Sequence, residues 1–308
     1  MKRTALALAV TAITGLAVLP SAAVATTATT TGSTGTAPKP LAGVAVYWSW
    51  DKGHPISRYE PGKGFTKLGN ATDAFQFSVS PDGTKLAWIT WGGKLHIRTG
   101  GKEKVVAKDA AGGFPCATPV WSPDSARVAY LGGDSHTGVS TLTIVKADGT
   151  GVRKAGNPRG VCHLAWSADG RRLAGYTGET DGVYIFDLKT GKSVRAKGIR
   201  LANHVQSLSP DARKVVVRTL SPTEPGGDGL WPGGFTPTVV DTVTGKRVPI
   251  PVKGTKVGAF YLPDGRLVVR VLGRTHNTLV VLDSAGRELQ RLAEPAQARN
   301  QALLQLVS

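Results

Sequence analysis

The sequence predicts an all-β repeat fold from a recurring turn, many turn-forming residues and almost no helical periodicity after residue 40. The turn lies between apolar or aromatic runs, and its aspartates are 42, 45, 42 and 53 residues apart. Its five copies are Ser80-Pro81-Asp82-Gly83, Ser122-Pro123-Asp124-Ser125, Ser167-Ala168-Asp169-Gly170, Ser209-Pro210-Asp211-Ala212 and Leu262-Pro263-Asp264-Gly265. This period is typical of a four-stranded propeller blade. The 39 Gly and 19 Pro among 308 residues fit many short strands joined by turns.

The turn residues have a structural explanation. Proline presets one dihedral angle, aspartate caps the backbone through its carboxylate, and glycine accepts positive φ. Repeated carboxylates could instead be acid groups, but their positions favour backbone capping. We therefore assign a structural role to the turn aspartates, which are Asp82, Asp124, Asp169, Asp211 and Asp264.

The N-terminal residues 1–25 have the pattern of a secretory signal peptide. Met1-Lys2-Arg3 supplies positive charge, Ala5 to Leu19 is apolar, and Ala23-Val24-Ala25 suits cleavage. A membrane anchor is the alternative, but this run is shorter than the roughly 20 residues that span a bilayer. Residues 26–41 are rich in Thr and Pro and are expected to form a flexible linker. We expect the mature protein to be secreted or associated with the cell envelope.

Residues 42–308 divide into six copies of a β-meander. The expected strands are 75–79, 86–91, 95–98 and 104–106 in the second copy, 120–121, 128–131, 142–145 and 152–153 in the third, and 164–166, 172–176, 183–187 and 193–194 in the fourth. The fifth and sixth copies retain a third strand and turn, at 239–246 and 280–287. The first has strands at 44–48, 56–59 and 65–68 but lacks one strand. The C-terminal strand 302–307 can supply it, which predicts a closed six-bladed β-propeller of four-stranded antiparallel blades.

These repeats resemble the TolB-like family of β-propellers, with their WD40-like blades. Trp121-Ser122-Pro123-Asp124 and Trp166-Ser167-Ala168-Asp169-Gly170 match the family's turn best, and the resemblance covers residues 42–308. We expect no counterpart of the N-terminal α/β domain of TolB. The resemblance implies a propeller that serves as an interaction platform.

The two cysteines, Cys116 and Cys162, enter equivalent strands of adjacent repeats. Oxidising compartments allow disulfides, so we expect these residues to pair. Two small buried thiols are the alternative.

Five of the six histidines map to the face opposite the aspartate turns. They are His54, His136, His163, His204 and His276. Imidazoles gathered at a channel mouth could bind a metal or ligand. However, they come from five blades without an expected close pair, so polar loop residues are the simpler interpretation and we assign neither metal nor cofactor. The chain also has no Gly-x-Ser-x-Gly elbow and no recognisable Ser, His and Asp set, so we expect no catalysis.

Tryptophans fall into two groups. Trp88, Trp121 and Trp166 occupy strands, where aromatic rings fill the space between blades. Trp231 lies instead in a Gly- and Pro-rich insertion, residues 222–237, and is a candidate partner contact. Packing within that loop is the alternative.

The chain is strongly basic, with 38 Lys and Arg against 21 Asp and Glu and a net charge of +17. Removal of Lys2 and Arg3 with the signal peptide leaves +15. The charge favours anionic partners, while export and the lack of a nucleic-acid motif argue against nucleic acid. Candidate patches are Lys189, Lys192, Arg195, Lys197 and Arg200, and Arg266, Arg270 and Arg274. Solvated outer strands are the alternative explanation.

Together these features predict a secreted, monomeric and non-catalytic propeller that binds a protein or an anionic envelope polymer. A propeller enzyme or small-molecule-binding protein that uses the histidine-bearing mouth is one alternative. A purely structural surface protein is another.

Overall fold

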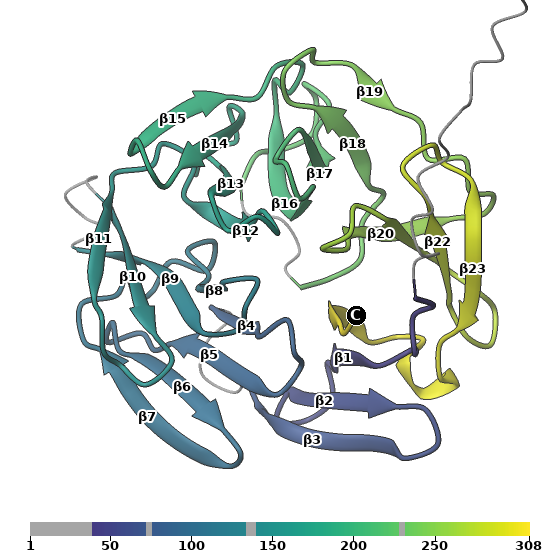
Figure 1. Cartoon of the computed structure of the whole chain (residues 1–308), viewed down its shortest axis with the longest axis horizontal. Helices are drawn as coiled ribbons and strands as arrows, with labels where there is room; N and C mark the ends of the chain where they lie inside the picture. The colour runs from purple at the N-terminus through teal and green to yellow at the C-terminus, as the bar shows by residue number, and fades with distance from the viewer. Residues whose placement is uncertain (1–38, 72–75, 134–139, 228–231) are drawn as a thin grey trace, which may run out of the picture. The chain divides into compact units, whose positions relative to one another are not determined.

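The computed structural model describes residues 39–71, 76–133, 140–227 and 232–308, so the predicted signal peptide and most of the linker lie outside it. Residues from Pro40 onward form one compact unit. Its strands form six four-stranded antiparallel sheets around a central axis (Figure 1). The six-bladed propeller predicted from the repeats is confirmed.

The blades are numbered here from the N-terminus. Blade 1 contains β24 (Ala302–Leu306), β1 (Ala45–Trp48), β2 (Pro55–Glu60) and β3 (Gly64–Asn70). Blade 2 contains β4 (Phe77–Val79), β5 (Lys85–Ile89), β6 (Leu95–Thr99) and β7 (Lys102–Ala107). Blade 3 contains β8 (Val120–Trp121), β9 (Arg127–Gly132), β10 (Thr141–Lys146) and β11 (Arg153–Gly156).

The second half repeats this arrangement. Blade 4 contains β12 (Cys162–Trp166), β13 (Arg172–Tyr176), β14 (Val183–Asp187) and β15 (Lys192–Arg195). Blade 5 contains β16 (Ala202–Leu208), β17 (Lys214–Thr219), β18 (Thr238–Asp241) and β19 (Arg247–Val248). Blade 6 contains β20 (Lys256–Tyr261), β21 (Leu267–Val271), β22 (Thr278–Leu282) and β23 (Glu288–Ala293). The helical structure in the described ranges is a single 3-10 turn, η2 (Ala296–Ala298), and no described helix has the length and apolar character needed to cross a membrane.

The C-terminal strand closes the ring as predicted. β24 pairs antiparallel with β1, with Trp48 opposite Ala302 and Ala45 opposite Leu306. The chain before β1 is also attached, because the backbone of Leu41 exchanges two hydrogen bonds, of 2.8 and 3.0 Å, with the Gln290 side chain. Blade 1 is therefore built from both ends of the propeller unit.

Four of the five aspartate turns, those that begin with a serine, share one hydrogen-bond pattern. In blade 2, the Ser80 hydroxyl donates to Asp82 Oδ1 at 2.5 Å and accepts the Lys85 amide at 2.9 Å. Partial burial alone would raise the pKa of Asp82, but hydrogen bonds from Lys85, Ser80 and Thr84 outweigh it and lower the pKa to about 2. The carboxylate thus has the capping role that the sequence predicts.

The core lies between the blades rather than within them. Six clusters of buried apolar side chains each join two neighbouring blades. The expected core role holds for Trp121 and Trp166, which are 3% and 9% exposed, whereas Trp88 is half-buried. Lys85 of blade 2 and Arg127 of blade 3 each lie over the tryptophan of the following blade, 5.9 and 6.0 Å from the ring centroid. The turns of blades 2 and 3 are thereby connected to the next blade.

The meander topology gives the propeller two different faces. The aspartate turns, between first and second strands, define the turn face. The connections between second and third strands, and those between blades, define the loop face. Candidate sites occur on both faces and at the outer rim.

Candidate functional sites

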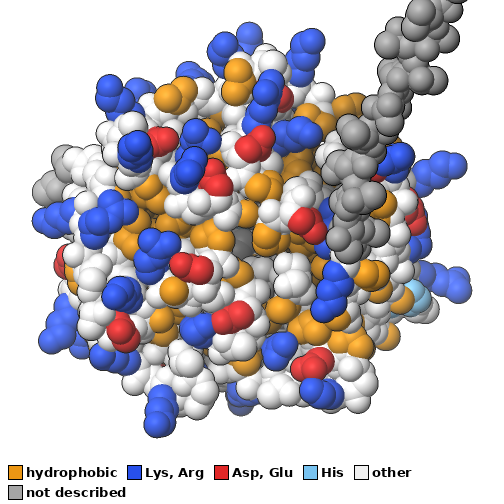
Figure 2. Space-filling model, viewed as in Figure 1, with side chains coloured by type: hydrophobic (Ala, Val, Ile, Leu, Met, Phe, Trp, Pro, Cys, Tyr) orange, Lys and Arg blue, Asp and Glu red, His pale blue; other side chains and the backbone are white. Residues whose placement is uncertain are grey.

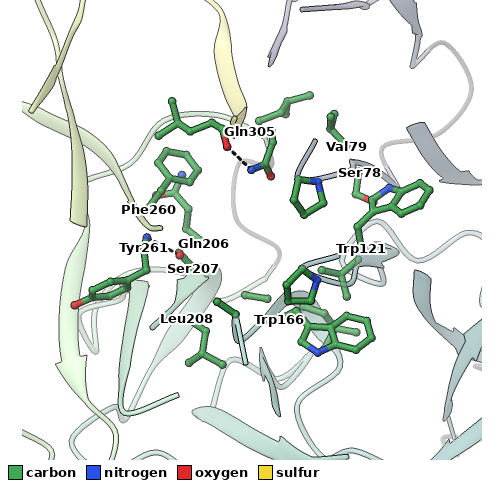
Figure 3. A pocket seen from close by; sticks show the side chains of 18 of the residues that line it. Ser78, Val79, Trp121, Trp166, Gln206, Ser207, Leu208, Phe260, Tyr261 and Gln305 are labelled. Carbon is green, nitrogen blue, oxygen red and sulfur yellow. Dashed lines mark hydrogen bonds between the residues drawn. The ribbon is translucent and has the colours of Figure 1, made fainter. Parts of the chain in front are cut away.

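The innermost strands enclose a cavity of about 200 Å³ that opens toward the turn face. Every blade contributes to it, through residues such as Val79, Trp121, Trp166, Leu208, Phe260 and Gln305 (Figure 3). Pro81, Pro123 and Pro263 of the turns also line it. The propeller therefore has a mainly apolar and aromatic recess on its axis.

Polar groups in this cavity mostly hold blades together. Gln206 Oε1 and Ser207 Oγ on β16 each accept a backbone amide of β20 at 2.8 Å, from Ala259 and Tyr261. Within the described part of the chain, Ser78 Oγ and the indole nitrogens of Trp121 and Trp166 are buried without a hydrogen-bond partner. The recess thus presents mainly apolar and aromatic surface. None of the described histidines lines it.

Two histidines meet at the opposite, loop-face end of the inner strands. His163 on β12 and His204 on β16 are 3% and 4% exposed, and their Nδ1 atoms are 2.6 Å apart. One ring donates the proton and the other accepts it. We expected no close pair among the histidines, and this prediction is wrong. The reason is geometric: both residues lie near the start of a first strand, and adjacent first strands converge at the axis.

The histidine pair is strongly desolvated. Burial lowers the pKa of His163 to about 3, and burial together with the charges of His163 and Arg218 lowers the pKa of His204 well below its usual value. Beside the pair, a cavity of about 310 Å³ is lined by His204, Arg218, Glu224 and Phe235, among others. The imidazoles are therefore neutral near pH 7 and lie next to a space that could hold a small molecule.

The remaining histidines do not join this pair. His54 stacks on Trp48 with ring centroids 5.5 Å apart, and His276 is exposed beside Thr275. His136 lies outside the described residues, as does Trp231. Within the described ranges, no group of three or more His, Cys, Asp and Glu side chains is arranged to hold a metal ion.

The expected disulfide is present between Cys116 and Cys162. It links the segment before β8 to the start of β12, and the backbone amide of His163 donates to the Cys116 carbonyl at 2.8 Å. His163 itself has a positive φ of 44°. The disulfide thus fixes the backbone that carries one histidine of the pair.

The rim of blade 4 carries a concentrated set of cations, here called the basic edge. It consists of Lys189, Lys192, Arg195, Lys197 and Arg200, all exposed. None of the five forms an ion pair with an acidic residue that the structure describes. Figure 2 shows Lys and Arg side chains projecting around the rim of the propeller, with acidic side chains set among them.

The second basic patch predicted from the sequence does not form. Arg266 and Arg270 are 7% and 4% exposed and pair with Asp264 and Glu294 at 2.7 and 2.8 Å, while Arg274 remains exposed. Sequence proximity was misleading because two of the three arginines point into the propeller. Conversely, Arg159 was not predicted, although its amide donates to Ser193 Oγ on β15 at 3.0 Å and its guanidinium lies over the Tyr184 ring of the same blade, 5.1 Å from the centroid.

No protein-family model and no curated protein sequence matches the chain. Among solved structures, TolB from Acinetobacter baumannii is similar with a TM-score of 0.57 and 16% identity, over 87% of this chain and 68% of that one. A chain of a nidogen/laminin complex is similar with a TM-score of 0.51 and 10% identity, over 85% of this chain and 97% of that one. These similarities show a shared propeller fold.

Proposed function

We propose that this TolB-type propeller is an exported, non-catalytic binding platform for a protein or an anionic component of the cell envelope. The observation that supports this proposal most directly is the basic edge. Its five exposed cations lie on a single outer strand, β15, and in the segments that flank it. Unpaired surface cations attract anionic partners and accelerate their encounter.

The construction of blade 4 favours a stable display of these charges. Ser193 on β15 accepts the Arg159 amide, and Lys197 donates its backbone amide to the Thr242 carbonyl of blade 5 at 2.9 Å. The outer strand is thus attached to the segments on both sides. A strand whose backbone is held in place loses less conformational entropy on binding than a mobile loop does.

Export is supported by two independent features. The N-terminal residues follow the charged, apolar and small-residue order of a signal peptide. The Cys116–Cys162 disulfide is a bond that persists in oxidising compartments. An envelope partner is therefore the relevant class to test.

The first experiment is a pull-down from cell-envelope extract on immobilised mature protein, eluted with increasing salt and analysed for proteins and polymers. A variant with all five basic-edge residues changed to Gln is compared with a control that loses the same charge elsewhere. The control carries Gln at the exposed Lys63, Lys67, Lys102, Lys253 and Arg274.

We expect the basic-edge variant to lose its partner, or to release it at much lower salt, while the control retains it. Equal retention by both variants would contradict the proposal. A partner that elutes only at high salt would indicate a specific protein contact, and early release of a polymer would indicate binding dominated by charge.

The histidine pair supports a second candidate function, the binding of a small molecule or metal at the loop face. His163 and His204 meet beside a cavity that also presents Arg218 and Glu224. Elemental analysis of purified protein, and thermal shifts with Zn²⁺, Ni²⁺ and Cu²⁺, test it against the His163→Gln/His204→Gln variant. No bound metal and no shift in the unaltered protein would exclude the metal form of this function.

A further inference from the structure

Two tryptophans project from the loop face at equivalent positions of adjacent blades. Trp50 and Trp91 are 55% and 71% exposed, and each lies two residues beyond its blade's second strand, β1 or β5. A tryptophan side chain can bury roughly 150–250 Å². Each ring therefore leaves on the order of 100 Å² of mainly apolar surface in water. Neither residue is needed to fill the core.

Tight turns hold both rings in place. Trp50 packs edge-on against the buried Trp48, with ring centroids 4.2 Å apart, and its turn is closed by the His54 amide, which donates to the Asp51 carbonyl at 2.8 Å. Gly53 and His54 in this turn have positive φ values of 83° and 46°. The first ring is thus presented on a defined backbone rather than on a long loop.

The Trp91 ring is supported from the neighbouring inter-blade connection. A Cβ atom added to Gly113 would lie 3.0 Å from Trp91 Cε3, so the absence of a side chain there admits the indole. The amide of Gly93 closes the turn on the Thr90 carbonyl at 2.9 Å. Phe114, which is 37% exposed, follows directly and extends the aromatic surface.

The loops that present the two rings also carry cations. Lys52, Lys94 and Lys108 are exposed, and none of them pairs with an acidic residue in the described ranges. The acidic residues of the same loops are already engaged: the carboxylate of Asp51 accepts the Ser49 hydroxyl at 2.6 Å, and that of Asp109 accepts the Tyr130 hydroxyl at 3.1 Å. The surface therefore combines flat apolar rings with positive charge.

We propose that this aromatic platform, defined as Trp50 and Trp91 with Lys52, Lys94 and Lys108, binds an acidic polysaccharide. The face of a sugar ring presents several C–H groups that pack on an indole face, and the acidic groups of the chain meet the lysines. Charge complementarity distinguishes this partner from a neutral glycan, and rigid indoles limit the entropy lost on binding. The proposal deepens the proposed function, on which it rests, by naming a partner class and a second contact surface.

The test uses isothermal titration of the mature protein with polygalacturonate, hyaluronan and dextran sulfate, and with poly-L-glutamate as an anion that lacks sugar rings. Trp50→Leu and Trp91→Leu keep an apolar side chain but remove the ring, whereas Trp→Tyr at each position keeps an aromatic face. Leu272→Ala is the matched control, because Leu272 is 44% exposed in a loop of the same face.

We expect at least one acidic polysaccharide to bind, each Trp→Leu change to weaken that binding about tenfold, and Trp→Tyr to restore part of it. Poly-L-glutamate binding should be unaffected by Trp→Leu but weakened by the basic-edge variant. The inference is overturned if none of the three polysaccharides binds or if the double Trp→Leu variant binds as tightly as the unaltered protein. Failure of the basic-edge variant to weaken poly-L-glutamate binding would instead count against the proposed function.

Discussion

The guanidinium of Arg270 and the carboxylate of Glu294 form a buried ion pair, with 2.8 Å between Nε and Oε2. Tyr47 of blade 1 donates its hydroxyl to the other oxygen of Glu294 at 2.9 Å. Arg270 also donates to the carbonyls of Ala298 and Gln301, just before β24, at 3.0 and 2.8 Å. This network joins blade 6 to both strands that begin blade 1, so it fastens the ring where its two ends meet.

The closure network leads to a first prediction about stability. Glu294→Ala leaves the Arg270 charge buried without its partner, and such a change costs about 3–5 kcal/mol. We expect this loss in the free energy of unfolding, measured by urea denaturation. Replacing both partners, as in Arg270→Met with Glu294→Leu, should cost less because no uncompensated charge remains.

The control is an exposed ion pair on the same blade. Glu288 and Arg291 are 2.7 Å apart, with side chains 45% and 52% exposed. Glu288→Ala should cost less than about 1 kcal/mol. If Glu294→Ala were as mild as Glu288→Ala, the closure network would not stabilise the ring.

The disulfide gives a second prediction. Cys116 and Cys162 are separated by 46 residues, so the bond restricts a long segment of the unfolded chain. Changing both to Ala should lower the free energy of unfolding by about 2–4 kcal/mol. Dithiothreitol should destabilise the unaltered protein by a similar amount and leave the double variant unchanged; an effect on both would point to a different cause.

The histidine pair gives a third prediction, on pH. The pKa of His163 is lowered to about 3, and that of His204 is lowered as well, so between about pH 6.5 and 3 the unfolded chain binds more protons than the folded one. The contribution of the neutral pair to the free energy of unfolding is therefore fully present above pH 6.5. It is lost progressively as the pH falls through this window. The expected slope is about 1.4 kcal/mol per pH unit for each histidine.

Denaturation between pH 6 and 4.5 measures this slope before most carboxylates titrate. The His163→Gln/His204→Gln variant should show a much shallower dependence. His276→Gln, which removes an exposed imidazole outside the pair, is the matched control. An equal slope in the pair variant and the unaltered protein would mean that the two imidazoles do not control acid sensitivity.

The propeller was predictable because its signals are local. Ser80, Pro81 and Asp82 determine a turn within a few residues, and recurrence at blade length then predicts the array. Ring closure followed from the missing strand of blade 1 and the extra strand at 302–307.

The candidate sites were less predictable because they depend on side-chain direction across blades. The contact between His163 and His204 arises between strands 41 residues apart, at positions where β12 and β16 depart from regular pairing with their neighbours. Arg270 appeared to be a surface cation in the sequence, yet its partner Glu294 lies 24 residues away. The exposure of Trp50 and Trp91 likewise depends on where the preceding strands, β1 and β5, end. A sequence-based assignment locates a strand end only to within a few residues.

The aspartate turns give a final prediction. Ser122 is fully buried, and its hydroxyl accepts the Arg127 amide at 2.9 Å while donating to Asp124. Ser122→Ala removes that acceptor from a buried amide, and we expect a loss of about 1–3 kcal/mol in thermal or urea unfolding. Thr150→Ala is the matched control, because the Thr150 hydroxyl donates to Asp148 at 2.7 Å in an exposed turn, where water can replace it.

Blade 6 shows that the propeller can also form this turn without a serine. There Leu262 replaces the serine and the turn is one residue shorter, because the Leu262 amide donates to the carbonyl of Arg266, whereas the Ser122 amide donates to that of Arg127. The Arg266 amide donates to Asp264 Oδ1 at 3.1 Å, as the Ala126 amide does to Asp124 in blade 3. The Leu262 side chain is 3% exposed and packs into the core between blades 6 and 1. In this shorter turn the residue that pairs with Leu262 is also the one whose amide the aspartate accepts, so the turn closes without a serine hydroxyl and gains apolar packing. Ser122→Leu should accordingly be at least as destabilising as Ser122→Ala, because the Arg127 amide loses its acceptor in both variants and the larger side chain must enter a fully buried position. A milder effect of Ser122→Leu would contradict this interpretation of the repeat.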